Sequence, residues 1–499
     1  MVELHTPSQA AQWLKSRVKG TLHADSRALV PGDGFIAWPG AATDGRKFAQ
    51  SALAQGASAC LMEKVGAEVF TPYGNGFATY AGLKADTGAI ASEFFDSPSE
   101  DLSLVAITGT NGKTSTAWWL AQALSALPSD MALPCGVIGT LGVGCPPHVV
   151  STGLTTPDPV LLQKTLREFV NMGLKVCAIE ASSIGIEEHR LDGTQIRVAV
   201  FTNFTQDHLD YHGSMAAYWA AKSQLFSWTG LRAAVINVDD VKGAELAETL
   251  RHSGLDVWPV SQIQSTRLHA RNVHYLALGL QLEVVEGDAV CMLSTHLIGA
   301  YNVSNLLGVI GAMRCLGVPL QQAVEACGQL MPVPGRMECV GGVGGPLVAV
   351  DYAHTPDALA QALTALRPMA EQRNGKLWCI FGCGGDRDAS KRPLMGAIAG
   401  KGADKVVVTS DNPRSEKPEA IITHILLGLP QGNDVSVQLD RAAAIAQTVA
   451  QASANDIILL AGKGHETTQE IAGHKTEFSD LAHAARALQL RSSGAGAAI

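Results

Sequence analysis

The stretch LSLVAITGTNGKTSTAWWLAQALSAL occupies residues 102–127 and decides the fold. Its first six residues form a largely apolar run that is typical of a buried strand. The segment TGTNGKTS follows at residues 108–115, and TAWWLAQALSAL at residues 116–127 has a helical pattern. A strand, a glycine-rich loop and a helix in this order predict a phosphate-binding loop inside an α/β domain.

The residue types of this loop fit the binding of a nucleoside triphosphate. Glycines let backbone N–H groups approach phosphate oxygens, Lys113 can reach the terminal phosphates, and the Thr114 hydroxyl can ligate Mg²⁺. The loop departs from the full GxxxxGK[ST] pattern, because Ile107 stands where the first glycine would be. A glycine turn that only caps a helix is the alternative, and GKT between a strand and a helix favours ATP binding.

Further apolar runs extend the fold in both directions. VCAIE, VAVFT and AAVINV, which begin at residues 176, 198 and 233, alternate with helical patterns and predict a mainly parallel sheet covered by helices. LVAVDY, LWCIFG, KVVVTSD and DIILLAG predict a second such sheet after residue 334. Residues 1–101 carry short β-like runs and turns, including DSR at 25–27 and GASACLM at 56–62. We expect an α/β fold with domains at residues 1–101, 102–334 and 335–499.

Composition excludes several classes of protein. Of the 499 residues, 46% are hydrophobic and 17% are charged, which is typical of a globular enzyme rather than a disordered chain. The net charge of −9 comes without a basic run, which argues against nucleic-acid binding. The ten cysteines include no CxxC pair, as in reduced cytosolic proteins, and the sequence has no signal peptide or membrane span. We expect a cytoplasmic protein without a zinc site.

Three positions outside the loop are candidates for chemistry. Glu180 ends the strand VCAIE, so its carboxylate should emerge beside the phosphate loop and could hold Mg²⁺, although a solvated side chain is equally compatible. His208, in the polar run NFTQDHLDYHG at 203–213, is a candidate metal ligand or a local hydrogen-bonding residue. Lys222 has mostly apolar neighbours in YWAAKSQLF and, taken alone, is typical of a surface lysine with a buried stem.

The motifs taken together resemble those of the Mur ligases. The resemblance covers nearly the whole chain, in order, and its most specific parts are DYAHTPDAL, GGDRD and DNPR. The motifs that carry it are GTNGKTS (109–115), EASS (180–183), DHLDYHG (207–213), GAYNVSN (299–305), PGRME (334–338), DYAHTPDAL (351–359), GGDRD (384–388), DNPR (411–414) and GKGHE (462–466).

The resemblance implies an architecture and an activity. It implies an N-terminal UDP-binding domain, a central ATPase of the P-loop type and a C-terminal Rossmann-like domain that binds an amino acid. It also implies an ATP- and Mg²⁺-dependent acid–amino-acid ligase of peptidoglycan precursor synthesis, and so of cell-wall formation, cell shape and division. The substrates would be ATP, UDP-N-acetylmuramoyl-L-alanyl-D-glutamate and meso-diaminopimelate. We expect a monomer with neither nucleic acid nor membrane as a partner.

The resemblance also assigns residues by matching position. For ATP these are Gly109, Thr110, Asn111, Gly112, Lys113, Thr114, Ser115, Asn302, Arg336 and Asp351. For the UDP-muramoyl-dipeptide they are Ser26, Thr155, Thr156, Ser182 and Arg190. For diaminopimelate they are Arg387, Asp411, Asn412, Pro413, Arg414, Gly462 and Glu466. The catalytic group is Lys113, Glu180, His208 and Lys222, and the metal ligands are Thr114, Glu180, His208 and Lys222.

Two of these assignments carry most of the chemistry. In the family, the lysine that matches Lys222 is carbamylated to N6-carboxylysine, which turns a cation into a metal-binding anion. Relatives that add lysine usually differ at the arginine of DNPR, so Arg414 points to the far carboxylate of diaminopimelate, which a guanidinium can bind with two hydrogen bonds. This sequence departs from the family at Ile184, where histidine is common, and at Glu188, where glutamine is common.

Other activities remain open at this stage. The same reaction with L-lysine, or a folylpolyglutamate-type or D-alanyl-D-alanine-adding ligase, would share the build of the chain, and DNPR and GGDRD argue against them. A regulatory or scaffolding protein that has lost chemistry would need neither Lys113 nor Glu180.

Overall fold

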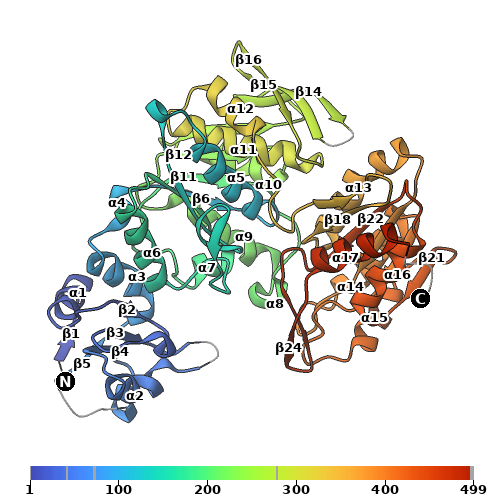
Figure 1. Cartoon of the computed structure of the whole chain (residues 1–499). Coiled ribbons are helices and arrows are strands. Elements are labelled where there is room, and N and C mark those ends of the chain that lie inside the picture. The colour runs from blue at the N-terminus through green and yellow to red at the C-terminus, as the bar shows by residue number, and fades with distance from the viewer. Residues whose placement is uncertain (1, 41–42, 71–74, 277–278, 495–499) are drawn as a thin grey trace.

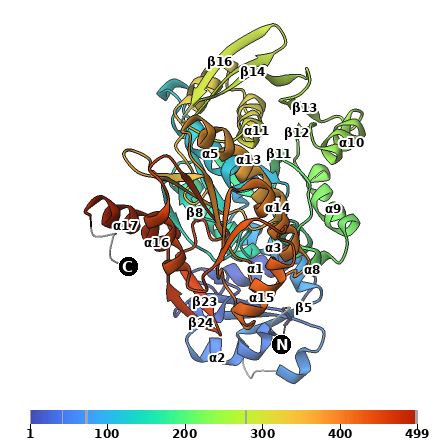
Figure 2. The ribbon, with the colours of Figure 1, turned by 90° about the vertical axis from the view of Figure 1, so that its right-hand side faces the viewer.

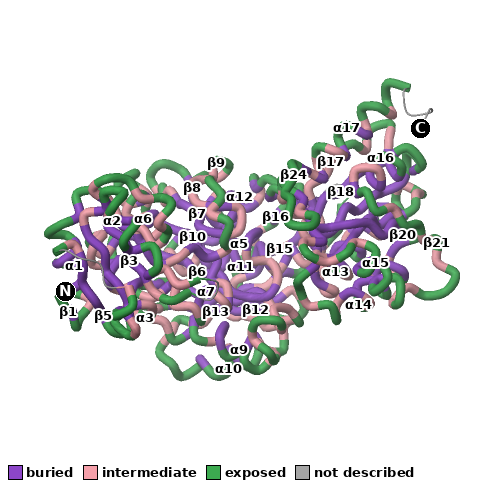
Figure 3. Tube along the Cα trace, turned by 90° about the horizontal axis from the view of Figure 1, so that it is seen from below, coloured by how far each residue is buried: buried purple, intermediate pink, exposed green. Residues whose placement is uncertain are grey.

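The computed structural model describes residues 2–40, 43–70, 75–276 and 279–494. The chain forms three α/β bodies that follow one another in sequence, from the N-terminal body at the lower left of Figure 1 to the C-terminal body at the right. The strands form the buried interior of each body, as the tube coloured by burial shows (Figure 3). The structure confirms the expected α/β class, with a mainly parallel central sheet and a second, largely parallel sheet later in the chain.

The N-terminal body is a parallel sheet with the strand order β1-β5-β4-β3-β2. Residues 25–27 were expected among the short β-like runs and turns of this body. They lie in a 3₁₀ turn, Ser26–Ala28, because the Asp25 side chain accepts a hydrogen bond from the Arg27 N–H at 3.0 Å and so caps the turn. The strands are Val2–Leu4, Leu22–His23, Gly34–Ala37, Ala59–Glu63 and Phe77–Tyr80, and the helices α1–α4 are Pro7–Lys15, Ala49–Ala54, Leu83–Phe94 and Pro98–Asp101.

The central body is built on a sheet with the order β16-β15-β14-β13-β12-β11-β6-β10-β7-β8-β9. Its middle strands are parallel and apolar because helices cover both faces. The strands are β6 Ser103–Thr108, β7 Cys135–Gly139, β8 Gly142–Cys145, β9 His148–Val150, β10 Val176–Glu180, β11 Ile196–Phe201, β12 Ala233–Asn237, β13 Asp256–Ser261, β14 Leu268–Leu276, β15 Gly279–Glu286 and β16 Ala289–Thr295.

Antiparallel hairpins flank this parallel centre on both sides and were not expected. Strands β14–β16 form a meander at the end of the molecule opposite the N-terminal body (Figure 2). One face of the meander is exposed, so exposed residues are interspersed with buried ones along β16, and its short apolar stretch AVCML at 289–293 was not predicted as a strand. Strands β7–β9 form the other antiparallel edge.

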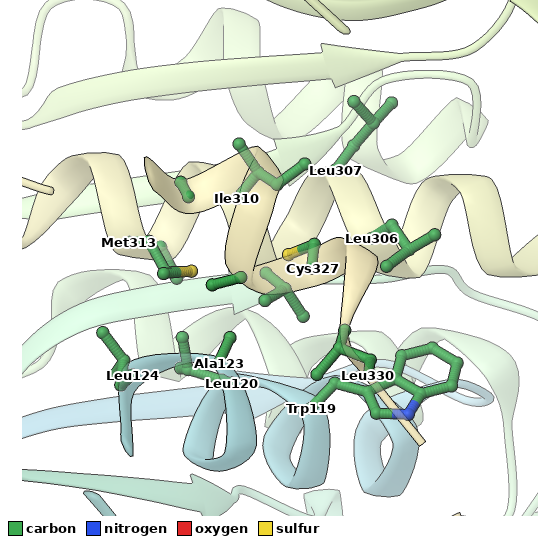
Figure 4. Packing of buried hydrophobic residues seen from close by; sticks show 14 of the residues in the cluster. Trp119, Leu120, Ala123, Leu124, Leu306, Leu307, Ile310, Met313, Cys327 and Leu330 are labelled. Atoms are coloured by element: carbon green, nitrogen blue, oxygen red, sulfur yellow. The ribbon is translucent and has the colours of Figure 1, made fainter. Parts of the chain in front are cut away.

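The helices of the central body place the phosphate loop. Helix α5 begins at Lys113, directly after the loop, and packs on the sheet beside helix α11. Figure 4 shows that Leu120 and Leu124 of α5 belong to the same core as Leu306 and Met313 of α11. The helices are α5 Lys113–Ser125, α6 Pro159–Asn171, α7 Ser183–Glu187, α8 Leu209–His212, α9 Met215–Ser223, α10 Val241–Leu250, α11 Tyr301–Cys315 and α12 Leu320–Gly328.

The C-terminal body is a sheet with the order β17-β18-β22-β19-β20-β21, with the parallel strands β18, β22, β19, β20 and β21. The strands are β17 Glu338–Gly341, β18 Leu347–Asp351, β19 Leu377–Phe381, β20 Lys405–Val408, β21 Asp434–Val437 and β22 Ile457–Ala461, with the hairpin β23 Thr468–Ile471 and β24 His474–Glu477. The helices are α13 Pro356–Gln372, α14 Lys391–Gly402, α15 Pro418–Leu426, α16 Arg441–Gln451 and α17 Asp480–Ser492. None of the helices in the described residues has the length and apolar content needed to span a bilayer.

Candidate active site

A cleft with a volume of about 1340 Å³ separates the central and C-terminal bodies. The phosphate loop lines one wall, and the loops that follow β19, β20 and β22 line the other. Hydrogen bonds join the walls, since Asn111 donates to the Asp357 carboxylate at 3.0 Å and Arg336 donates to the Thr114 hydroxyl at 3.1 Å. The cleft therefore brings together motifs from distant parts of the chain, such as GTNGKTS and GKGHE.

The phosphate loop has room for no side chain at its glycines. A Cβ atom at Gly109, where φ is +146°, would lie 1.9 Å from the Thr202 hydroxyl oxygen, and one at Gly112 would lie 2.4 Å from the Asn305 amide oxygen. Gly112 is left-handed and directly precedes α5, so the loop passes into a helix N-terminus whose free N–H groups favour an anion. Lys113 Nζ donates to the carbonyl oxygens of Gly109 at 3.0 Å and Thr110 at 2.8 Å.

Thr114 and Glu180 form a buried oxygen pair beside the loop. The Thr114 hydroxyl donates to Glu180 Oε2 at 3.0 Å, which places the end of β10 where the strand-end argument expected it. Thr140 donates to the same carboxylate twice, from its N–H at 2.7 Å and its hydroxyl at 3.2 Å. Hydroxyl and carboxylate oxygens are ligands that Mg²⁺ prefers, so the residues present fit this ion.

Lys222 lies in the floor of the cleft and is only 1% exposed. The surface position that its sequence surroundings indicate when taken alone is wrong, because α9 packs this face against the phosphate loop. Its Nζ donates to the Gly109 carbonyl at 2.7 Å, the same oxygen that accepts from Lys113, and lies 4.5 Å from the centre of the Tyr218 ring. Burial, reinforced by the charge of Lys113, holds the pKa of Lys222 well below its usual value.

His208 lines the cleft next to Asp207. Its Nε2 lies 3.4 Å from the Asp207 carboxylate, and His354 of the C-terminal body lies 3.9 Å from the same group. Burial lowers the pKa of His208 to about 4, so the imidazole is neutral and able to act as a ligand at neutral pH. Within the described part of the chain, no three His, Cys, Asp or Glu side chains gather as a metal-binding group, and His208 and Glu180 are not joined in one.

The residues assigned to the muramoyl-dipeptide separate into two places. Thr155, Ser182 and Arg190 line the cleft. Thr156 is fully buried below them, where it bonds to Ser182 at 2.9 Å and accepts Arg190 on its carbonyl oxygen at 3.0 Å, so it supports the wall. Ser26 lies in the N-terminal body and is not part of the cleft lining.

The other ATP candidates come from both walls of the cleft, Asn302 from the central body and Arg336 and Asp351 from the C-terminal body. Asn302, at the start of α11, donates to the Ile298 carbonyl at 2.7 Å, and Arg336 stacks over the Tyr352 ring at 4.4 Å. Asp351 accepts the Met337 N–H at 2.8 Å, and burial raises its pKa to about 6. All three line the cleft.

The residues assigned to the amino acid form one cluster at the carboxyl ends of β19, β20 and β22. Arg387, Asn412, Arg414 and Glu466 line the cleft, whereas Asp411 is buried beneath Gly462. The Arg414 backbone is left-handed at φ 53° and pairs with β23, since its N–H donates to the Glu470 carbonyl at 3.1 Å. Arg414 Nη1 donates to the Gly385 carbonyl at 2.7 Å. Pro413 is buried, and its carbonyl oxygen accepts the Glu416 N–H at 3.0 Å.

Sequence reasoning missed several residues that shape the cleft. Thr140 follows the apolar strand β7, so the same strand-end argument that selected Glu180 could have found it. His354 lies inside DYAHTPDAL but carried no assignment. Lys463 lies inside GKGHE, and nothing in its sequence surroundings distinguishes it from a surface lysine.

Comparisons with known proteins agree with this geometry. Family models match at residues 21–77 (Mur ligase family, catalytic domain), 107–313 (Mur ligase middle domain) and 335–464 (Mur ligase, glutamate ligase domain). A UDP-N-acetylmuramoyl-L-alanyl-D-glutamate–2,6-diaminopimelate ligase of Acidovorax sp. (strain JS42) is 60% identical over 98% of both chains. The chain belongs to the Mur ligase family.

Solved structures of Mur ligases share the fold. A UDP-N-acetylmuramoyl-L-alanyl-D-glutamate–2,6-diaminopimelate ligase matches with a TM-score of 0.65 and 34% identity, covering 95% of each chain. The MurF ligase of Thermotoga maritima in complex with ADP matches with a TM-score of 0.65 at 17% identity, over 97% of this chain and 98% of that one, which shows the shared fold. As a Mur ligase, the chain is an enzyme of the ligase class.

Proposed function

We propose that this Mur ligase joins meso-diaminopimelate to UDP-N-acetylmuramoyl-L-alanyl-D-glutamate at the expense of ATP. The observation that carries the proposal is the cleft itself, in which a phosphate loop with Lys113 faces Arg414 of DNPR. The 60% identity to a ligase with this printed activity supports the choice of substrates. The resulting product belongs to peptidoglycan precursor synthesis, and we propose a cytoplasmic monomer with domains at 1–101, 102–334 and 335–499.

The central wall would bind and activate ATP. The N–H groups of the loop and of the first turn of α5 hydrogen-bond the phosphate oxygens, and Lys113 turns from the loop carbonyls to the terminal phosphate. Thr114 and Glu180 would hold Mg²⁺, with His208 and a modified Lys222 as further ligands. Bound there, Mg²⁺ would neutralise charge on the phosphate oxygens.

The reaction then proceeds in two displacements. A carboxylate is a poor acylating agent because oxide is a poor leaving group, so the side-chain carboxylate of the D-glutamate first attacks the γ-phosphorus. The bond to ADP breaks and an acyl phosphate forms. The neutral amine of diaminopimelate attacks the acyl carbon, inorganic phosphate leaves, and the amine loses one proton as the amide forms. Lys113 stabilises the charge that spreads over the transferred phosphoryl group.

We propose that Lys222 works as a carbamate. Two lysine amines share the Gly109 carbonyl, and two cations there would repel each other. Carbon dioxide adds only to a neutral amine, which the buried position favours. A bond forms between the amine nitrogen and the carbon of CO₂, and one amine proton is released to solvent. The product is an anion, so the pair Lys113–Lys222 would become attractive, and a carbamate oxygen would offer a further ligand for Mg²⁺ in the floor of the cleft.

Selection of the amino acid would fall to the C-terminal wall. The Arg414 guanidinium would bind the far carboxylate of diaminopimelate, which lysine lacks. Arg387 and the residues around Asn412 and Glu466 would hold the remaining groups, with the acidic side chains meeting the ammonium of the same end.

The experiment that tests the proposal is phosphate release from ATP by the purified protein with UDP-N-acetylmuramoyl-L-alanyl-D-glutamate. Meso-diaminopimelate, L-lysine and no amino acid are compared. We expect release with diaminopimelate alone. Release with lysine at a similar kcat/KM would contradict the role of Arg414, and release with neither would contradict the proposed reaction.

A further inference from the structure

Lys463 is a buried cation that the proposed reaction does not use. Its side chain is 0% exposed, and it is not among the residues that line the cleft. Its Nζ donates to Glu466 Oε2 at 2.8 Å, to the Thr468 carbonyl at 2.8 Å and to Asn412 Oδ1 at 3.2 Å. All three donors of the ammonium are therefore used, and two of them reach side chains of the amino-acid cluster.

These contacts determine how Asn412 and Glu466 face the cleft. Asn412 Oδ1 accepts from Lys463 and from the Glu470 N–H at 3.0 Å, while its Nδ2 donates to Glu466 Oε2 at 2.7 Å. The amide is thus held in one orientation. Both Lys463 and Asn412 bond Oε2 of Glu466, and no hydrogen bond from a described residue reaches Oε1. One carboxylate oxygen of Glu466 is therefore anchored, and the residue itself lines the cleft.

We infer that Lys463 is the positioning residue of the amino-acid site: from below the cleft, it orients Asn412 and Glu466 toward the ammonium end of the incoming diamino acid. The inference rests on the proposed function, because it assigns this role within the same reaction. Lys463 touches no substrate and acts through these two side chains.

The energetic reason is the cost of an unpaired carboxylate in a mostly buried place. The Glu466 side chain is 28% exposed, and Asp411, which is also buried, lies in the same cluster. A charge-assisted hydrogen bond to a lysine offsets the desolvation of the carboxylate and keeps one rotamer. Without the ammonium, Glu466 would turn to solvent and the Asn412 amide would lose one of its three contacts.

The experiment is a steady-state comparison of wild type with Lys463→Met, which keeps the length of the side chain and removes the charge. We expect the KM for diaminopimelate to rise about 10- to 100-fold, because a charge-assisted hydrogen bond is lost. The KM values for ATP and the UDP-dipeptide should change less than about threefold. In a Glu466→Gln background, Lys463→Met should raise the KM for diaminopimelate less than about threefold, because Lys463 and Glu466 act as one unit.

Two further variants make the outcome decisive. Lys463→Gln keeps hydrogen-bond donors without the charge, and it should fold and give an intermediate KM for diaminopimelate. Asp456→Asn is the matched control: it removes a buried carboxylate at the opposite end of β22, where Asp456 accepts from the Lys376 N–H at 2.8 Å and Trp378 Nε1 at 2.9 Å. It should lower thermal stability without changing the KM for diaminopimelate.

The outcomes separate the inference from the proposed function. Wild type that releases no phosphate with diaminopimelate would overturn the proposed function. Wild type that responds, with Lys463 variants whose KM values for all three substrates are unchanged or rise equally, would overturn the positioning role alone. The positioning role would also be overturned if Lys463→Met raised the KM for diaminopimelate as much in the Glu466→Gln background as in wild type.

Discussion

Lys222 in the central body and Lys463 in the C-terminal body are equally buried but have different partners. Lys222 has one carbonyl oxygen, which it shares with a second lysine, whereas Lys463 has a carboxylate, an amide oxygen and a carbonyl oxygen. A buried amine without a counter-charge is driven to the neutral form and can react, and one with a full set of acceptors serves as an anchor. The hydrogen-bond partners of a buried lysine, rather than its burial alone, therefore determine whether it is reactive or has a structural role.

The largest effect is expected from removal of the reactive lysine, Lys222. Lys222→Ala should reduce kcat by about 10³-fold or more, because it removes both the proposed carbamate and a ligand for the metal. Short free carboxylates should partly restore turnover by occupying the vacated space. The measurement is phosphate release with and without added carboxylate, with the exposed Lys401→Ala as the control. Full activity in Lys222→Ala would remove the carbamate from the mechanism.

Asp351 extends the comparison to a buried acid. Burial raises its pKa to about 6 from 3.8, so between these pH values the folded protein holds more protons than the unfolded chain. Stability therefore falls as the pH rises through this window, by about 3 kcal/mol in total. Asp351→Asn cannot ionise, and relative to wild type it should gain this amount between pH 4 and pH 7, as measured by calorimetry.

Asp456→Asn is the control of opposite sign for this prediction. Although burial raises the pKa of Asp456, hydrogen bonds from the Lys376 N–H and Trp378 outweigh it and hold the pKa below its usual value. The stability that this carboxylate contributes is present above the unfolded pKa and is lost as the pH falls. A parallel pH dependence in the two variants would contradict the role of burial at Asp351.

Arg414 tests the selection of the amino acid on the C-terminal wall of the cleft. Arg414→Ala should raise the KM for diaminopimelate about 10- to 100-fold, since a charge-assisted bond to the far carboxylate is lost. Any residual use of lysine should change much less. Arg367→Ala, which removes a pair with Asp404, is the matched arginine control. Equal effects on diaminopimelate and lysine would refute the assignment.

The smallest effect is expected at a partly exposed ion pair between Glu188 and Lys84. Glu188 binds Lys84 of the N-terminal body at 2.6 Å and accepts the Tyr211 hydroxyl at 2.7 Å. Glu188→Gln, which introduces the residue common in the family, should change stability by less than about 1 kcal/mol, because water screens the pair. The KM for the UDP-dipeptide should change no more than about threefold. A larger change would show that this contact between bodies positions the substrate.

Much of the fold could be predicted from the sequence, and the failures have local causes. The buried strands β6, β10, β11 and β22 are apolar on both faces, so each is recognisable as a continuous run. The meander β14–β16 has an exposed face and short apolar stretches, so it was missed. The turn at residues 25–27 is stabilised by the Asp25 cap, a side-chain contact.

The candidate site divides in the same way. The loop at 109–115 was predicted because glycine, lysine and threonine at fixed spacing have one common use between a strand and a helix. Glu180 was found from its place at a strand end. The environments of Lys222 and Lys463 could not be found, since each depends on atoms from several elements: the carbonyl of Gly109 for one, and Asn412 and Thr468 for the other.

The amino-acid sequence by itself determined the local elements, the phosphate loop and the family motifs, because these depend on neighbours within a few residues. The order of the strands, the position of the cleft between the two bodies and the partners of each buried charge became clear only from the tertiary structure. The physical reason is that the free energy of a buried charge depends on which donors and acceptors surround it, and these come from chain segments far apart in sequence.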